Sequence, residues 1–213
     1  MDRIRAGIVG HTGYIGEELL ACLRRHDLVE VVLLDAPSTR EVRRPRPSPG
    51  TTPGSRALRE AQRALGSSSR GVELPRQPMD AVLGDDPLDA VLLATPADVS
   101  LELAPRFVAA GTRVVDLSGA FRLPETGTFE AWYGMPHGCP ELLLEAVYGL
   151  PELNRAQIVD AQLVANPGCL ATAAIIAIAP LQRAGLVDGG SMVVCDAKSG
   201  VSGAGKGSRS VTS

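Results

Sequence analysis

A strand, a glycine-rich loop and a helix follow one another at the start of the chain, and this order restricts the fold more than any other feature. Residues 4–9 are apolar enough for a buried strand, and a helical pattern runs from Glu17 to about Arg25. Glycines at the spacing found between them permit a tight turn, bring backbone close to a pyrophosphate and let the helix pack on the strand. The order predicts a Rossmann-type dinucleotide-binding fold, with an ordinary glycine-containing turn as the alternative. The loop reads Gly10-His11-Thr12-Gly13-Tyr14-Ile15-Gly16.

A second predicted strand, over 29–34, ends where such folds select their cofactor. Asp35 follows it, and an acidic residue at this point suits the free ribose 2′-hydroxyl of NAD. The polar residues just beyond, Ser38, Thr39 and Arg40, suit the 2′-phosphate of NADP. All of them could also be turn residues, so the residues alone leave the choice of cofactor open.

Two further strands, over 90–94 and 113–117, extend the pattern to an α/β fold with a doubly wound parallel sheet. Ligands bind at the carboxyl ends of such strands, which is where Thr95 and Pro96 lie. Ser118 and Arg122 follow the second strand and could hold an anionic substrate. A guanidinium suits this task because it donates two hydrogen bonds at once to a carboxylate or phosphate. Arg122 could equally cap the loop.

The stretch 163–181 carries a candidate nucleophile. A short predicted strand stops at Asn166-Pro167-Gly168, and the Ala- and Ile-rich run that begins at Cys169 is long enough for a buried helix. A cysteine in the first turn of a helix lies beside backbone N–H groups whose partial positive charge favours thiolate over thiol. Cys169 is therefore interpreted as a nucleophile, with a small core residue as the alternative.

A second small-residue loop follows a predicted strand over 192–196. Ser199 and Gly200 in this loop could lie along the nicotinamide or a phosphate. Cys195, in the strand, and Cys22, in the first helix, are interpreted as core residues. The four cysteines are widely spaced and form no metal-ligand pattern, so the sequence predicts no metal site and a reduced, cytoplasmic protein.

Composition narrows the class of partner. The chain has 213 residues, 45% of them hydrophobic, and a formal net charge of −3, which suits one large domain or one domain and part of a second. The charge favours neither nucleic acid nor a membrane surface, and no apolar run is long enough to span a bilayer. The first strand begins so close to Met1 that we expect no signal peptide. A basic, proline-rich segment over 41–78 is interpreted as a mobile insertion.

Five motifs stand in a fixed order: GIVGHTGYIGEELL, VVDLSGAFRL, VYGLPELNR, VANPGCLATAA and DAKSGVSGAGK. Together they resemble the N-acetyl-γ-glutamyl-phosphate reductase family of arginine biosynthesis, over nearly the whole chain except about 42–86. The resemblance implies a Rossmann-type NADP domain over 1–160, the N-terminal part of a mixed α/β catalytic domain over 161–213, and a homo-oligomer. The cofactor-binding residues would be Gly10, Thr12, Gly13, Tyr14, Ile15, Gly16, Ser38, Thr39, Arg40, Thr95, Pro96, Ser199 and Gly200.

The resemblance also implies a reaction, the reductive dephosphorylation of an acyl phosphate with Cys169 as nucleophile. The thiolate displaces phosphate to give a thioester, which hydride from NADPH reduces, and N-acetylglutamate semialdehyde is released. Cysteine suits this chemistry because a thiolate attacks an acyl carbon readily and a thioester accepts hydride far better than a carboxylate does. A related reductase of aspartyl or aminoadipyl phosphate, or a dinucleotide-binding fragment without activity, are the alternatives.

Three features depart from the pattern of the family. Position 11 is histidine where the family usually has a small residue, and the segment 35–40 replaces a serine/arginine cluster. The chain stops at Ser213, before the segment that supplies an acid/base histidine in the family. None of the histidines at 11, 26 and 137 matches that motif. We therefore expect this chain to be an incomplete form of the enzyme.

Overall fold

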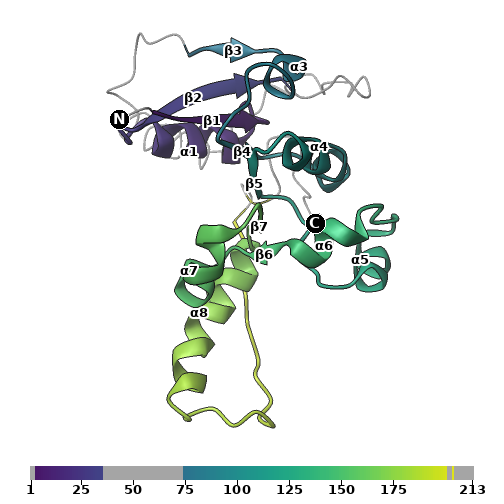
Figure 1. The fold of residues 1–213 in the computed structure, drawn as a ribbon. Helices are drawn as coiled ribbons and strands as arrows, with labels where there is room; N and C mark the ends of the chain where they lie inside the picture. The colour runs from purple at the N-terminus through teal and green to yellow at the C-terminus, as the bar shows by residue number, and fades with distance from the viewer. Residues whose placement is uncertain (1–2, 36–73, 201–202, 204–213) are drawn as a thin grey trace, which may run out of the picture.

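The computed structural model describes residues 3–35, 74–200 and 203, and a parallel sheet of seven strands runs through them (Figure 1). The strand order is β3-β2-β1-β4-β5-β7-β6, and every neighbouring pair is parallel. The chain therefore crosses over between β1 and β4, which is the switch point at which open α/β sheets bind ligands. The strands are β1 (Ile4–Val9), β2 (Val29–Leu34), β3 (Arg76–Gln77), β4 (Ala90–Leu93), β5 (Arg113–Asp116), β6 (Val147–Tyr148) and β7 (Leu163–Ala165).

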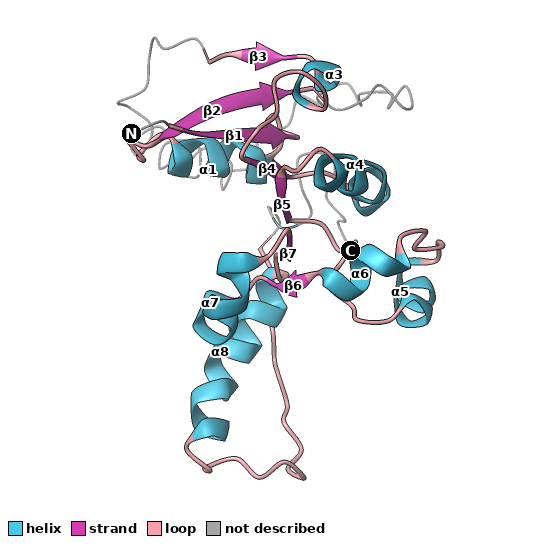
Figure 2. Cartoon of the chain, in the orientation of Figure 1, coloured by secondary structure: helices cyan, strands magenta, loops and turns pink. Residues whose placement is uncertain are grey.

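Helices connect the strands and cover both faces of the sheet (Figure 2). On one face, Ile8, Val31 and Leu33 pack against the leucines of α1. On the other, a larger cluster joins the alternate strand residues to α3, α4 and α6. Burial on both faces explains why the strands are apolar throughout. The helices are α1 (Tyr14–Leu23), α3 (Met79–Val82), α4 (Ala97–Ala109), α5 (Thr126–Tyr133), α6 (Pro140–Glu145), α7 (Pro151–Asp160) and α8 (Cys169–Arg183).

The structure confirms the predicted α/β class with its doubly wound parallel sheet. It also confirms five of the predicted strands, within one residue at each end, and the two predicted helices. The largest boundary error is at α1, which begins at Tyr14 rather than Glu17 because the helix starts directly from the glycine loop. Two helices, α5 and α6, and the edge strand β6 lie in a connection for which the sequence predicted no regular structure.

Four predictions about the core were wrong. Helix α8 contains no buried residue, and it projects away from the sheet (Figure 1). The segment 192–196 forms no strand, because it pairs with none of the strands in the described part of the chain, and its Cys195 is exposed. Cys22 is also exposed, although its neighbours Leu19, Leu20 and Leu23 pack against the sheet.

Several predictions concern residues outside the described part of the chain. Ser38, Thr39 and Arg40 are among them, as is the greater part of the expected insertion, 41–73. Of that insertion, the structure describes residues 74–78, which include the edge strand β3. Among the described residues, no helix combines the length and apolar character needed to cross a membrane.

Candidate active site

Four neighbouring strands deliver candidate residues to one edge of the sheet. Parallel strands end at a common edge, and β1, β4, β5 and β7 are adjacent in the sheet order. The hydrogen-bond ladder continues just past the strand ends, from Ala94 N–H to Val9 (2.9 Å) and from Asn166 N–H to Asp116 (2.8 Å). The loops that follow these strands therefore start at the same level. Cys169 and the glycine loop are three strands apart, roughly 14 Å in the plane of the sheet.

The glycine loop makes a tight turn that leaves its backbone open beside the helix. Gly10 has a φ of 85°, and a Cβ at this position would overlap the carbonyl oxygen of Ala94. Gly16 is buried, and a Cβ there would overlap the carbonyl oxygen of Gly10, so α1 packs directly on the loop. At Gly13, the N-cap of α1, a Cβ would meet only the Gly10 oxygen among the described atoms, at 3.4 Å. A cradle of this shape at a helix N-terminus fits a dinucleotide pyrophosphate.

A buried polar cluster joins the ends of β4 and β5. Asp116 accepts hydrogen bonds from the Ser118 hydroxyl (2.8 Å) and the Ser118 backbone N–H (3.1 Å). Thr95 Oγ1 lies 2.8 Å from Ser100 Oγ. Burial raises the pKa of the Asp116 carboxyl, although hydrogen bonds from both serines and the charge of Arg122 act in the opposite direction. The cluster holds the two loops in a fixed relation.

Ser100 is a member of this cluster that the sequence reasoning missed. It is fully buried on α4, on the face that also carries Leu103, Ala104 and Phe107. These positions follow the i, i+3, i+4, i+7 spacing of a core-facing helix. A serine within such an apolar stripe needs a polar partner, and that requirement was the available signal.

Arg122 joins the loop after β5 to the turn that precedes Cys169. Its Nε donates to the carbonyl oxygen of Asn166 and its Nη2 to that of Leu117, both at 2.7 Å. Its Nη1 lies against Gly168, where a Cβ would be 3.3 Å away. Arg122 therefore closes the loop, as one of the two sequence interpretations had it. Its Nη1 also lies beside the N-cap of α8.

Cys169 begins α8 directly at the sheet edge, and its thiol is exposed. The preceding Gly168 is the N-cap and offers no side chain to the first helical N–H groups. The carbonyl oxygen of Gly168 instead accepts hydrogen bonds from both the backbone N–H and the hydroxyl of Thr172, each at 2.9 Å. The thiol consequently lies at the positive end of the helix dipole and within reach of a ligand.

Alkylation should separate the cysteines of the folded chain by rate. The Cys139 thiol donates to the carbonyl oxygen of Leu101, and burial, with a smaller effect from Glu141, raises its pKa. We expect iodoacetamide to modify Cys139 at least about tenfold more slowly than Cys169, which should react fastest of the four. Mass spectrometry of peptides after timed quenching gives the four rates. Equal rates for Cys139 and Cys169 in the folded chain would contradict this assignment.

The remaining candidate residues occupy more open positions. Thr12, Ile15 and Pro96 are exposed, and Tyr14 is half-buried at the start of α1. Ser199 and Gly200 lie in an exposed, irregular segment after α8, where the Ser199 hydroxyl donates to the Gly200 carbonyl oxygen and lies beside Gly203.

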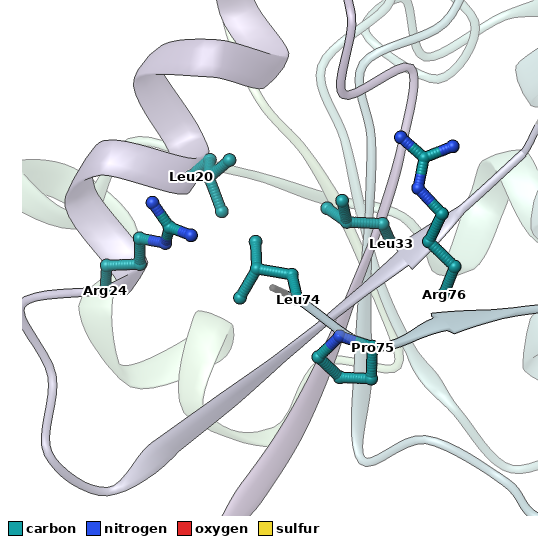
Figure 3. Close-up of a pocket in the computed structure, with 6 residues that line it drawn as sticks. All are labelled: Leu20, Arg24, Leu33, Leu74, Pro75 and Arg76. Atoms are coloured by element: carbon teal, nitrogen blue, oxygen red, sulfur yellow. The ribbon is translucent and has the colours of Figure 1, made fainter. Parts of the chain in front are cut away.

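A hollow of about 750 Å³ lies apart from these residues, between α1, β2 and the chain that enters β3 (Figure 3). No candidate residue lines it, so we assign it no part in the chemistry. Among the described residues, no cluster of histidine, cysteine and acidic side chains could hold a metal ion. The lining residues are Leu20, Arg24, Leu33, Leu74, Pro75 and Arg76.

The fold and the glycine loop are those of a dinucleotide-binding domain, and the chain belongs to the semialdehyde dehydrogenase family. The family model described as "Semialdehyde dehydrogenase, NAD binding domain" matches residues 5–161, and the model described as "Semialdehyde dehydrogenase, dimerisation domain" matches residues 169–213. The described fold is thus a nicotinamide-dinucleotide-binding Rossmann domain, followed by residues that match a second domain of the same family.

Curated relatives identify the branch of the family that the chain resembles. It is 46% identical over 204 residues to an N-acetyl-gamma-glutamyl-phosphate reductase from Ectopseudomonas mendocina, covering 96% of this chain and 54% of that protein. It is 45% identical to the protein of the same name from Azotobacter vinelandii, covering 97% of this chain and 55% of that protein. These matches confirm the resemblance that the five motifs carried. The chain spans about half the length of the curated relatives it matches.

Solved structures support the fold alone. Aspartate semialdehyde dehydrogenase II from Vibrio cholerae, complexed with ASA, matches with a TM-score of 0.54 at 20% identity, covering 86% of this chain and 47% of that chain. A second structure of that enzyme gives a TM-score of 0.53 and covers 86% of this chain and 43% of that chain.

Proposed function

We propose that this chain forms the dinucleotide-binding part, and the start of the catalytic part, of an NADP-dependent reductase. The reaction is conversion of N-acetyl-γ-glutamyl phosphate to N-acetylglutamate semialdehyde and phosphate. The observation that carries the proposal is the exposed Cys169 thiol at the start of α8, on the sheet edge that holds the glycine loop. The substrate is taken from the name of relatives that are 40–46% identical to this chain.

Cys169 would act as the nucleophile. Its thiolate attacks the acyl carbon, and the bond from that carbon to the phosphate oxygen breaks. Phosphate departs, and the acyl group stays on the cysteine as a thioester. When bound, NADPH would supply the hydride for reduction of the thioester carbon. The carbon–sulfur bond of the resulting thiohemiacetal then breaks, which releases the aldehyde and restores the thiolate. The N–H groups at the start of α8 would stabilise the oxyanion that forms at each addition.

The dinucleotide would lie along the sheet edge from the glycine loop toward Cys169. The preference for NADP rests on the family resemblance and on the residues that follow Asp35, whereas Asp35 itself is exposed at the end of β2 and would suit NAD. The proposed contacts are Gly10, Thr12, Gly13, Tyr14, Ile15 and Gly16 with the pyrophosphate, Ser38, Thr39 and Arg40 with the 2′-phosphate, and Thr95, Pro96, Ser199 and Gly200 with the nicotinamide.

The anionic part of the substrate would bind beside Ser118 and Arg122. The Ser118 hydroxyl donates to Asp116 and accepts from the Ala120 N–H at 3.0 Å, so it would position the loop more than it would bind ligand. Arg122 keeps its Nη1 next to Gly168 while its other nitrogens hold the two loops. It would thus attract the substrate anion and fix the turn that carries Cys169.

Replacing Arg122 by lysine is expected to lower the free energy of unfolding by about 1–3 kcal/mol, because two carbonyl oxygens lose a charged donor while the positive charge remains. Arg113→Lys is the matched control. Arg113 also donates to a backbone carbonyl, that of Val159 at 3.0 Å, but it is exposed and starts β5 at the opposite edge of the sheet. Urea unfolding followed by circular dichroism compares the two variants. Equal losses of unfolding free energy would show that the hydrogen bonds of Arg122 stabilise the fold no more than that of Arg113 does.

The proposed activity is tested by phosphate-dependent reduction of NADP with N-acetylglutamate semialdehyde as substrate. The assay is run on the product of the complete reading frame and on residues 1–213 alone, with aspartate semialdehyde as the competing substrate. Turnover that requires phosphate and prefers the acetylated substrate supports the proposal. Preference for aspartate semialdehyde favours a related reductase. Binding of NADPH without turnover in either protein favours a binding module.

The match of residues 169–213 to a dimerisation domain supports a homo-oligomer as the working form. All four cysteines are free, which supports a reducing compartment such as the cytoplasm. Sedimentation of the purified protein measures the first property directly.

A further inference from the structure

His11 brings an imidazole ring into the glycine loop, and the two nitrogens of this ring can donate or accept hydrogen bonds. Both of these nitrogens, Nδ1 and Nε2, are buried, and neither has a hydrogen-bond partner among the described residues. Buried polar atoms without partners are rare in folded proteins, and each one asks for an explanation such as a bound ligand.

The position of His11 indicates which ligand could supply the partner. It follows Gly10 at the switch point between β1 and β4, and its Cα lies directly against Gly16 in the first turn of α1. The side chain therefore starts from the backbone that cradles the pyrophosphate in the proposed function. A pyrophosphate oxygen is a charged acceptor, and an imidazole N–H that donates to it makes a stronger bond than one between neutral groups.

We propose that an N–H of the His11 ring donates a hydrogen bond to the pyrophosphate of the bound dinucleotide, which makes His11 an affinity-determining residue of this chain. The inference rests on the proposed function only in requiring that the loop binds a dinucleotide. It assigns the unpartnered nitrogen a role that a small residue at position 11 could not perform.

Binding measurements on residues 1–213 and on the complete protein test the inference without any need for turnover. NADPH fluorescence and calorimetry with ADP-ribose, which carries the pyrophosphate without the nicotinamide, give dissociation constants. His11→Phe keeps the ring and removes the nitrogens, and we expect it to weaken both ligands about tenfold. His11→Gln, which restores an N–H donor, should recover part of that loss. His26→Phe, at an exposed histidine after α1, is the matched control and should change neither constant.

A spectroscopic measurement on the unaltered protein keeps the inference falsifiable if His11→Phe fails to fold. Long-range proton–nitrogen NMR should show one His11 ring nitrogen shifting when ADP-ribose saturates the site. If the unaltered protein binds both ligands while His11→Phe binds them equally well, or while the His11 signals stay unchanged, the inference is wrong. If the unaltered protein binds neither ligand, the proposed function fails first and this inference falls with it.

Discussion

Aldehyde formation is expected to fall below about 1% of its original rate when Cys169 is replaced by serine in the product of the complete reading frame. A serine hydroxyl is a far weaker nucleophile than a thiolate, and the helix dipole at the start of α8 cannot ionise it at neutral pH. NADPH affinity should stay within about twofold, because Cys169 lies roughly three strand spacings from the glycine loop. The reaction is followed in reverse, as phosphate-dependent NADP reduction with N-acetylglutamate semialdehyde as substrate, because this direction requires the same thioester.

Cys195→Ser provides the matched control for this experiment. Cys195 is also exposed, but it lies in the irregular segment after α8 and belongs to no strand or helix. It should keep full activity. A Cys169→Ser variant that retains more than a few per cent of the rate would rule out covalent catalysis at this sulfur. A burst of phosphate equal to the enzyme concentration, seen with the acyl phosphate when NADPH is withheld, would support the thioester directly.

Replacing Gly16 by alanine should destabilise the chain by roughly 1–3 kcal/mol and weaken NADPH binding by at least about tenfold. The new methyl group would overlap the carbonyl oxygen of Gly10 and the Cα of His11, and both are backbone atoms that cannot turn away. The sign of this effect is informative, because alanine otherwise favours a helix over glycine by about 1 kcal/mol. Urea unfolding and NADPH titration on the same preparations measure the two quantities.

Gly13→Ala separates binding from stability in the same loop. Gly13 has a φ of −79° and a ψ of 168°, which alanine adopts freely, and a Cβ there would lie 3.4 Å from the Gly10 oxygen. The stability cost should therefore stay under about 1 kcal/mol. NADPH binding should weaken all the same, because the methyl group fills space that the pyrophosphate needs. A Gly16→Ala variant as stable as the original would show that α1 can move off the loop at little cost.

The parts of the fold that the sequence predicted well are those with a local signal. Buried parallel strands read as short apolar runs, and glycine or proline marks their ends, so β1, β2, β4, β5 and β7 could be located. The candidate nucleophile could be found for the same reason, since a turn of Asn, Pro and Gly fixes the start of α8. In each case the residues that determine the structure are neighbours in the chain.

The parts that could not be predicted depend on contacts between distant residues. Helices α5 and α6 lie in a connection whose anchor is His137, fully buried with its Nε2 2.8 Å from the carbonyl oxygen of Ala120. Phe121 and Phe129 pack edge-on against the imidazole ring, with ring centroids 5.3 and 4.9 Å away. No periodic pattern in the sequence predicts such a cluster.

The prediction that α8 is buried was wrong for a different reason. Its apolar composition predicted burial, yet Leu170, Ile176 and Leu181 are all more than 40% exposed in this chain. An apolar composition indicates that a helix favours burial, but it does not identify the segment that would bury it. The polar cluster of Asp116 and Ser100 illustrates the same limit, because a buried hydrogen bond between two elements has no signature in either one alone.

The turn before Cys169 is held from three directions: Pro167 is buried, the Asn166 N–H bonds to Asp116, and the Asn166 carbonyl accepts from Arg122. The position of the Cys169 sulfur is thus fixed by the residues that precede it. The fourteen helical residues after Cys169 contribute little to that position. Substitutions in the distal turns of α8 would therefore change association or solubility without displacing its first residue.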